Sequence, residues 1–318
     1  MNSENVKNIK SLLASYNSDT IKKVRKLNFV GIENRDVYNT TAPFKVKQTI
    51  YLIGRAELRE DELETQSVFF KKENNKWSLI PSASVFNLQD PFICKIKDNL
   101  IFGGVEVEQK SPEGKIRFRT NFYKGKDINS LKLFARGPWG MKDIRLTELS
   151  DGKIGIFTRP RGRRGGRGKI GFRIIEKLTE IKPRMLSNAE IIPNIFAKGE
   201  WGGVNDIHLL KDGSLGVLGH IARFRRDKET KILKKYYYPI TFKFNTETKE
   251  ASGIKILVSR TDLPEGEAKR EDLYYIIFPG GIIRKNNQAE LYAGVSDTES
   301  YKITLTDPFN EYEQEQPD

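Results

Sequence analysis

The sequence predicts an all-β protein, a five-bladed β-propeller with a short helical segment at its N-terminus. The main observation is a repeated unit in which a polar residue, an apolar strand, a tight turn, a second apolar strand and a polar residue follow one another. The unit occurs five times, at residues 39–57, 90–106, 143–159, 206–220 and 280–297. The copies begin roughly fifty to seventy residues apart. Such a repeat is typical of radial β architectures, whose small sheets bury their faces only against neighbouring sheets.

The clearest copy lies within residues 201–222, which also contain both histidines of the chain. Residues 207–210 and 215–218 are its apolar runs, and Lys211-Asp212-Gly213 has the composition of a hairpin turn. His208 falls inside the first run, so we expect a packed structural residue. His220 stands at the exit of the second run, where a functional role and a structural role are both open.

The N-terminal segment is the one stretch with helical periodicity. Its apolar residues Val6, Ile9, Leu12 and Leu13 recur at helical spacing, and Asp19 or Thr20 can cap a second short helix that runs through Lys26. We therefore expect a helical extension over residues 1–28, a single propeller domain over residues 29–310, and an acidic tail over residues 311–318.

Composition bounds the class of protein. The hydrophobic content of 37% suffices for a core, and no apolar run approaches membrane-spanning length. No apolar signal segment follows the N-terminal charges. The single cysteine, Cys94, excludes an internal disulfide and is typical of a reducing compartment. These observations predict a cytoplasmic protein that does not contact membranes.

The formal charge of +13 fits nucleic acid, a membrane surface or an anionic substrate as a partner, but most basic residues are scattered, so we expect much of the excess to form a solvated, lysine-rich surface. The densest basic run is RPRGRRGGRGK at residues 159–169. Arg-Gly repeats bind single-stranded nucleic acid in other proteins, but this run is short and lies between two strand-like segments. We expect a cationic loop over the mouth of a central funnel, and nucleic acid is the less favoured partner.

Polar residues recur at the ends of the hairpins that lie opposite their turns. Because the first strand of every propeller blade lines the central axis, these ends are expected to converge on one funnel. The strand starts carry Asn39, Asp90, Asp143 and Asp206, and the exits carry Arg55, Glu57, Glu106, Arg159, His220 and Asp297. A ring of carboxylates and cations in one cleft is a candidate active site. Loop capping is the alternative role for Asp143 or Asp206.

Cleavage of a glycosidic bond requires a proton donor and a second group that attacks or activates the attacking molecule. Asp90 is the best candidate for the general acid, and Asp143 and Asp206 are candidates for the base or for holding sugar hydroxyls. If phosphate attacks, cations must gather it, and the candidates are Lys142, Arg145, Arg159 and His220. Trp201 can stack on a sugar face or pack in the core. The number of cations favours phosphorolysis over hydrolysis.

Several motifs carry a family resemblance. The ordered set NTTAPF, NLQDPF, GPWGMKDIRL, FTRPRG, WGGVNDIHLL, LGHIA, FPGGIIR and YAGVSDTESYKITLTDPF resembles the bacterial family known as domain of unknown function 1861, over residues 29–309. That family is similar in turn to the five-bladed propellers of the mannoside phosphorylases (glycoside hydrolase family 130), and more distantly to arabinanases and β-fructosidases.

The resemblance to mannoside phosphorylases implies roles for particular residues. It places the general acid at Asp90 in Gln89-Asp90-Pro91-Phe92, where the phosphorylases have Glu-Asp-Pro-Arg. It places a phosphate-binding histidine at His220, although the flanking residues differ from the Tyr-His-Gly of the phosphorylases. Arg159 takes the place of their His-Arg-Pro arginine, Asp297 ends a Gly-Ala-Ala-Asp-like motif, and Arg55 resembles an early arginine of the first blade.

We therefore expect a carbohydrate-active enzyme that cleaves a small mannoside-type glycoside by phosphorolysis or hydrolysis. Its partners are a small carbohydrate and inorganic phosphate as a possible co-substrate. One cysteine and two histidines do not supply the usual zinc ligands, so we expect neither a metal nor another cofactor. The alternative is a non-catalytic propeller that binds an anionic glycan, nucleic acid or protein.

Overall fold

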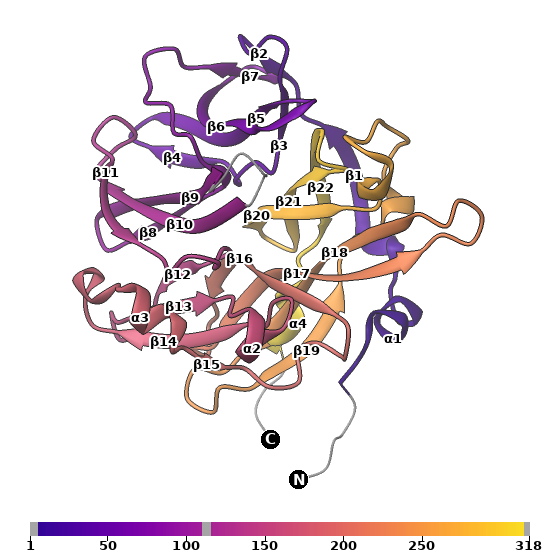
Figure 1. Ribbon diagram of the computed structural model, residues 1–318. Coiled ribbons are helices and arrows are strands. Elements are labelled where there is room, and N and C mark those ends of the chain that lie inside the picture. The colour runs from indigo at the N-terminus through magenta and orange to yellow at the C-terminus, as the bar shows by residue number, and fades with distance from the viewer. Residues whose placement is uncertain (1–5, 110–115, 315–318) are drawn as a thin grey trace.

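The computed structural model describes residues 6–109 and 116–314, which form five sheets around one axis (Figure 1). One sheet has six strands and the other four have four strands each. Within each sheet the neighbouring strands are antiparallel, apart from one short parallel pair in the first sheet. The chain is thus a five-bladed β-propeller, as the sequence predicts.

The first and second blades come from the N-terminal part of the described chain. The first blade contains β2 (Phe29–Val30), β3 (Asp36–Tyr38), β4 (Phe44–Val46), β5 (Thr49–Leu58), β6 (Asp61–Glu73) and β7 (Lys76–Leu79). The second blade contains β8 (Gln89–Ile96), β9 (Asn99–Gln109), β10 (Ile116–Gly125) and β11 (Lys132–Arg136). In both blades the first strand of the predicted hairpin forms the inner edge of the sheet.

The third and fourth blades follow the same order from the inner edge outward. The third blade contains β12 (Arg145–Glu148), β13 (Ile154–Thr158), β14 (Gly171–Ile175) and β15 (Glu190–Ile191). The fourth blade contains β16 (Trp201–Leu209), β17 (Leu215–Arg226), β18 (Leu233–Phe244) and β19 (Ala251–Ile256). The inner strands β8, β12 and β16 contact one another in sequence around the axis.

The fifth blade combines both ends of the described chain. It contains β20 (Ile277–Lys285), β21 (Gln288–Val295), β22 (Glu299–Thr306) and, as its outermost strand, β1 (Ile21–Lys26). The predicted second helix through Lys26 is therefore wrong. The strand β22 offers an open row of backbone groups, and pairing with β1 satisfies them and closes the ring. The helical extension thus ends before Ile21 instead of reaching residue 28.

The helices are short and lie outside the sheets. They are α1 (Ile9–Ala14), α2 (Gly162–Gly165), α3 (Pro183–Ser187) and α4 (Asn310–Gln314), with 3-10 turns at Ser18–Thr20, Leu178–Glu180, Arg260–Asp262 and Glu271–Leu273. The helix α1 buries Ile9 and Leu12 in the core between the third and fourth blades. The predicted acidic tail begins inside α4, and residues 315–318 lie outside the described residues. No helix of the described segments has the length and apolar character needed to cross a membrane.

The core is divided into clusters that lie between neighbouring blades. One cluster joins Phe157 and Phe172 of the third blade to Phe244 of the fourth, with ring centroids 4.8–5.3 Å apart. Comparable clusters join the first blade to the second, the second to the third, the fourth to the fifth and the fifth to the first. Each sheet thus buries its faces against its neighbours, which is the physical reason for the repeat.

The inner strands are interrupted at the level where the site lies. Asn39, Asp90 and Asp143 all have left-handed backbone conformations, with φ of 48°, 48° and 57°. In the fourth and fifth blades the register shifts at Asn205 and at Gly280. At Gly280 an added Cβ would lie 1.5 Å from the carbonyl oxygen of Thr40, so the neighbouring backbone requires glycine. These bulges re-aim side chains of the inner strands at one end of the axis.

Candidate active site

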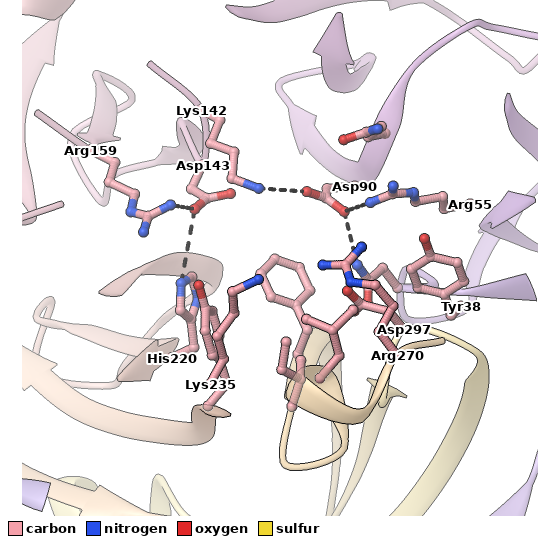
Figure 2. A pocket seen from close by; sticks show the side chains of 16 residues that line it. Tyr38, Arg55, Asp90, Lys142, Asp143, Arg159, His220, Lys235, Arg270 and Asp297 are labelled. Carbon is pink, nitrogen blue, oxygen red and sulfur yellow. Dashed lines mark hydrogen bonds and ion pairs between the residues drawn. The ribbon is translucent and has the colours of Figure 1, made fainter. Parts of the chain in front are cut away.

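A cavity of about 210 Å³ lies on the axis, and all five blades contribute to its wall (Figure 2). Eight of the predicted site residues line it: Asn39, Arg55, Asp90, Lys142, Asp143, Arg159, His220 and Asp297. These residues are widely separated in the sequence, and the inner strands and the strands next to them bring them together. The cavity is therefore the predicted funnel.

Asp90 is the most highly connected carboxylate of the cavity. Its Oδ1 accepts hydrogen bonds from Arg55 Nη1 at 3.0 Å and Asn39 Nδ2 at 2.9 Å, and its Oδ2 lies 3.1 Å from Lys142 Nζ. Burial alone would raise the pKa of Asp90, but Lys142, Arg55 and the Asn39 amide outweigh it and hold the pKa well below the usual range. Asp90 is thus ionised at neutral pH.

The pKa of Asp297 is shifted in the opposite direction to that of Asp90. It lies in the turn between β21 and β22, where Ser296 and Asp297 have φ of 55° and 54°. Burial raises the pKa of Asp297, and the negative charge of Asp90 adds to this, against the opposing effect of Arg55. Within residues 6–109 and 116–314 its carboxylate has no hydrogen-bond partner. The cavity thus contains two carboxyl groups whose pKa values are shifted in opposite directions.

Asp143 and Arg159 form a buried ion pair on the side of the third blade. Arg159 Nη1 donates to Asp143 Oδ2 at 2.7 Å, and both side chains are buried. Burial raises the pKa of Asp143, but Arg159 and Lys142 outweigh this and lower it. Lys142 therefore lies between two ionised carboxylates, which raise its pKa against the opposing effect of burial. Its side chain is 30% exposed and remains accessible to a ligand.

His220 is fully buried beside this pair. Its Nδ1 lies 2.8 Å from Asn205 Oδ1, and its Nε2 lies 3.9 Å from Asp143 Oδ2, beyond hydrogen-bond distance. Burial, together with the positive charges of Arg159 and Lys142, lowers the pKa of His220 to about 3 despite Asp143. The imidazole is therefore neutral at physiological pH, and an Nδ1–H donor to Asn205 leaves Nε2 as an acceptor.

Three buried polar atoms around Asp143 have no hydrogen-bond partner among the described residues. They are Asp143 Oδ1, Arg159 Nε and His220 Nε2. Buried polar atoms are almost always paired in folded proteins, because an unpaired one costs about 1–3 kcal/mol. Such atoms beside a cavity indicate a position that a polar ligand completes.

A buried chain of ionic contacts supports Asp90 from behind the cavity wall. Glu57, which is fully buried, accepts hydrogen bonds from Arg55 Nε at 2.8 Å and Tyr38 Oη at 2.7 Å. The ammonium group of Lys269 also contacts Glu57. The order Lys269, Glu57, Arg55, Asp90 and Lys142 alternates in charge, so each group is stabilised by its neighbours.

Five predicted residues lie outside the cavity lining. Glu57 is behind the wall, and Glu106 pairs with Arg119 at 2.6 Å on the neighbouring strand. Trp201 is buried and donates from Nε1 to Tyr237 Oη at 3.2 Å, so it packs in the wall and does not face the cavity. The predicted shared funnel is wrong for these three residues, because each side chain is already engaged by protein groups.

Arg145 and Asp206 line a second cavity of about 180 Å³ instead. Arg145 is buried and donates to the carbonyl oxygens of Asn205 and Ile144 at 3.0 and 3.1 Å. Asp206 accepts from the backbone N–H groups of Ile207 and Ile282. The register shift between Val204 and Asp206 explains the displacement, because a shift of one residue changes the face of the strand on which a side chain lies.

Eight further residues line the cavity although sequence reasoning did not find them: Tyr38, Gln89, Lys235, Tyr237, Arg270, Leu273, Ile276 and Phe278. Arg270, Leu273 and Ile276 belong to the connection between the fourth and fifth blades, which no repeat describes. The apolar members of the set give one side of the cavity a surface that suits the C–H face of a sugar. Gln89 and Phe278 lie in quoted motifs, NLQDPF and FPGGIIR, and these motifs were the sequence signal for them.

No group of three or more histidine, cysteine or carboxylate side chains within the described segments is arranged to hold a metal ion. His208 packs with its ring centroid 5.3 Å from that of Phe309, outside the cavity lining. The basic run at residues 159–169 contains α2 and begins at the cavity with Arg159.

The chain is similar to a known protein family and to several solved structures. A family model described as protein of unknown function (DUF1861) matches residues 14–311. The search of curated proteins found no match. Similar solved structures include MPT-4, a mannose phosphorylase from Leishmania mexicana in complex with phosphate ion, with 31% identity, coverage of 98% and 96% of the two chains, and a TM-score of 0.88.

Two further structures extend this comparison. MPT-1, a GDP-Man-dependent mannosyltransferase from Leishmania mexicana, is 31% identical, with 95% of each chain covered and a TM-score of 0.87. The β-1,2-mannobiose phosphorylase of Listeria innocua is 12% identical, with 89% of this chain and 94% of that chain covered and a TM-score of 0.64. At that identity the third comparison shows a shared fold only.

Proposed function

The chain belongs to the DUF1861 family, and from this membership and the charged cavity we propose that it is a mannoside phosphorylase. It transfers a mannosyl group between a mannoside and inorganic phosphate. The observation that carries the proposal is that the cavity places Asp90 and Asp297, two carboxyl groups with opposite pKa shifts, beside the cations Lys142 and Arg159. The similarity to a mannose phosphorylase over nearly both full chains supports it.

The reaction assigns one role to Asp90. A phosphate oxygen attacks the anomeric carbon, the bond from that carbon to the leaving oxygen breaks, and the leaving oxygen takes a proton from Asp90. The products are mannose 1-phosphate and the released sugar. In the reverse direction the ionised Asp90 removes the proton from the acceptor hydroxyl while phosphate leaves.

The cations of the cavity keep Asp90 ionised, which suits the reverse direction. Lys142 can act in both directions of the reaction, because it contacts Asp90 and its partly exposed ammonium group can also bind phosphate. A phosphate anion between Lys142 and Arg159 would offset their positive charge. The pKa of Asp90 then rises, and the group becomes a better proton donor in the direction that consumes phosphate. His220 Nε2 and Asp143 Oδ1 accept hydrogen bonds from sugar or phosphate hydroxyls.

The test is a panel of mannosides incubated with and without phosphate, with mannose 1-phosphate measured as the product. We expect product only with phosphate and a loss of about 10²–10⁴-fold in Asp90→Asn. Asp151→Asn is the matched control, because Asp151 is an exposed turn residue far from the cavity lining. Free mannose formed without phosphate would identify a hydrolase instead. A panel with no turnover, together with binding of an anionic glycan, would identify a non-catalytic binding module.

A further inference from the structure

We propose that a groove beside the cavity, the arginine groove, binds a second phosphate group, carried by the sugar or nucleoside on the far side of the scissile bond. The arginine groove is formed by residues 138–141, residues 160–164 and Ser187. This inference rests on the proposed function, since it assigns a substrate class to the same site. It adds an anion site that the transfer of a mannosyl group to inorganic phosphate does not require.

Consecutive residues of the chain line the arginine groove and the cavity. Met141 lines the groove and is followed in the chain by Lys142 and Asp143, which line the cavity. Pro160 lines the groove and directly follows Arg159 of the cavity. The groove has a volume of about 390 Å³. The two linings therefore adjoin at two points of the chain, so a substrate whose mannosyl group occupies the cavity would extend toward this groove.

The charged side chains of the groove lining are three cations and no carboxylate. Arg161, Arg163 and Arg164 line it, and neither Asp nor Glu does. Neutral sugars require acceptors as well as donors for their hydroxyls, whereas guanidinium groups offer donors only. The oxygens of a phosphate group accept hydrogen bonds, and at most one of them carries a proton. They match a guanidinium group in geometry and charge. The lining thus favours a phosphate group over another neutral sugar.

Two of the three arginines of the groove are available for a ligand. Arg161 and Arg163 have exposed side chains and no carboxylate partner among the described residues, whereas Arg164 donates to the carbonyl oxygens of Ser187 and Ala189. Partial burial lowers the pKa of Arg161, and the positive charges of Arg159 and Arg167 add to this. A phosphate group would relieve this repulsion on binding.

The loop that presents these arginines has a defined shape. Gly162 and Gly166 exchange backbone hydrogen bonds of 2.8 and 2.7 Å, and both have positive φ, at 65° and 59°. An added Cβ at Gly165 would lie 1.9 Å from the carbonyl oxygen of Pro160. Because side chains at these positions would disrupt the loop, the backbone that carries the arginines is held in one shape, which lowers the entropy cost of ordering the loop on binding.

The test is calorimetric binding to Asp90→Asn protein, which separates binding from turnover. Two pairs of probes are compared: mannose 6-phosphate with mannose, and GDP with guanosine. We expect at least one phosphorylated probe to bind about tenfold or more tightly than its neutral counterpart, and this preference to fall by about tenfold in an added Arg161→Gln/Arg163→Gln double substitution. The probe that shows the preference identifies its source, a sugar phosphate or a nucleotide.

The matched control is Arg25→Gln/Arg173→Gln, which removes the same charge from exposed positions outside the groove. It should keep the preference. The inference is overturned if neither probe is preferred over its neutral counterpart, or if both double substitutions weaken the phosphorylated probe equally. These outcomes are distinct from failure of the proposed function, which is read from phosphate-dependent turnover by the unmodified enzyme.

Discussion

At the scale of single residues, the cavity separates two carboxyl groups that are chemically identical in the unfolded chain. Asp90 contacts two cations and an amide, whereas Asp297 lies in a buried turn near another carboxylate. Surroundings of this kind lower the pKa of Asp90 and raise the pKa of Asp297. Their contributions to stability should therefore have opposite signs.

Asparagine substitutions at these two positions test this contrast. Asp90→Asn leaves Arg55 and Lys142 without their shared counter-charge and should lower the free energy of unfolding by about 3 kcal/mol. Asp297→Asn removes a half-buried carboxylate that has no hydrogen-bond partner among the described residues, and it should raise the free energy of unfolding by about 1 kcal/mol. Urea unfolding at pH 7.5 measures both. Equal destabilisation by the two substitutions would contradict the assignment.

A second prediction at this scale concerns His220. Its pKa is lowered to about 3 in the folded state and is about 6.5 in the unfolded chain. Below pH 6.5 the unfolded state binds a proton that the folded state does not, so stability is lost as the pH falls. The loss should reach about 1.4 kcal/mol at pH 5.5 relative to pH 7.5.

The measurement is urea unfolding at both pH values for the unmodified protein and for His220→Gln. The substitution should remove this part of the pH dependence. His208→Gln, at the only other histidine, is the control for a general effect of histidine removal. An equal pH dependence in the unmodified protein and His220→Gln would show that the imidazole is protonated in the folded state.

At the scale of elements, the connection between the fourth and fifth blades acts as a strap across the cavity wall. It contributes Arg270, Leu273 and Ile276 to the lining. Tyr275 stacks on Tyr236 with ring centroids 4.4 Å apart, and Lys269 reaches the buried Glu57. The strap is thereby joined to Asp90 through Glu57 and Arg55.

Lys269→Met tests this connection. It leaves Glu57 with Arg55 as its only cationic partner among the described residues, and we expect a loss of about 3 kcal/mol in the free energy of unfolding. Activity should fall as well. Without Lys269 the carboxylate of Glu57 can shift, and Arg55, which Glu57 positions, then loses its contact with Asp90. Adding Glu57→Gln should restore part of the stability, so that a double-mutant cycle gives a coupling of at least about 1 kcal/mol. Additive effects of the two substitutions would refute the coupling.

At the scale of the whole molecule, the ring of blades is closed by a strand from the other end of the chain. The strand β1 pairs with β22 through residues 21–26 and 301–305, and Val24 packs against the core of the fifth blade. Closure by β1 brings the first and last blades together, and both contribute to the cavity. Figure 1 shows β1 beside β22 at the rim of the fifth blade.

Removal of residues 1–27 should therefore lower the melting temperature by at least about 10 °C and promote aggregation through the exposed edge of β22. Removal of residues 1–7, which precede α1, is the control and should leave the melting temperature within about 2 °C. Thermal unfolding and light scattering measure the two effects. A stable, monodisperse protein without residues 1–27 would show that the closing strand is dispensable.

The sequence by itself determined the repeat, the propeller and the group of polar residues that includes Asp90, Arg159 and His220. Alternation of apolar residues and turn chemistry are local properties, so they can be read along the chain. The hairpin ends converge because every blade repeats the same strand order around the axis. The common position of these residues therefore follows from the repeat alone.

Only the tertiary structure decided the exceptions. Ile21–Lys26 have helical spacing but pair with β22, because the open edge of the last blade offers more hydrogen bonds than an isolated helical turn. Asp206 leaves the cavity through a one-residue register shift in β16, which local pattern does not encode. Lys269 meets Glu57 of the first blade through ring closure, a contact between distant segments. Which aspartate keeps its proton depends on these contacts as well, because a pKa is set by the charges and burial around a group.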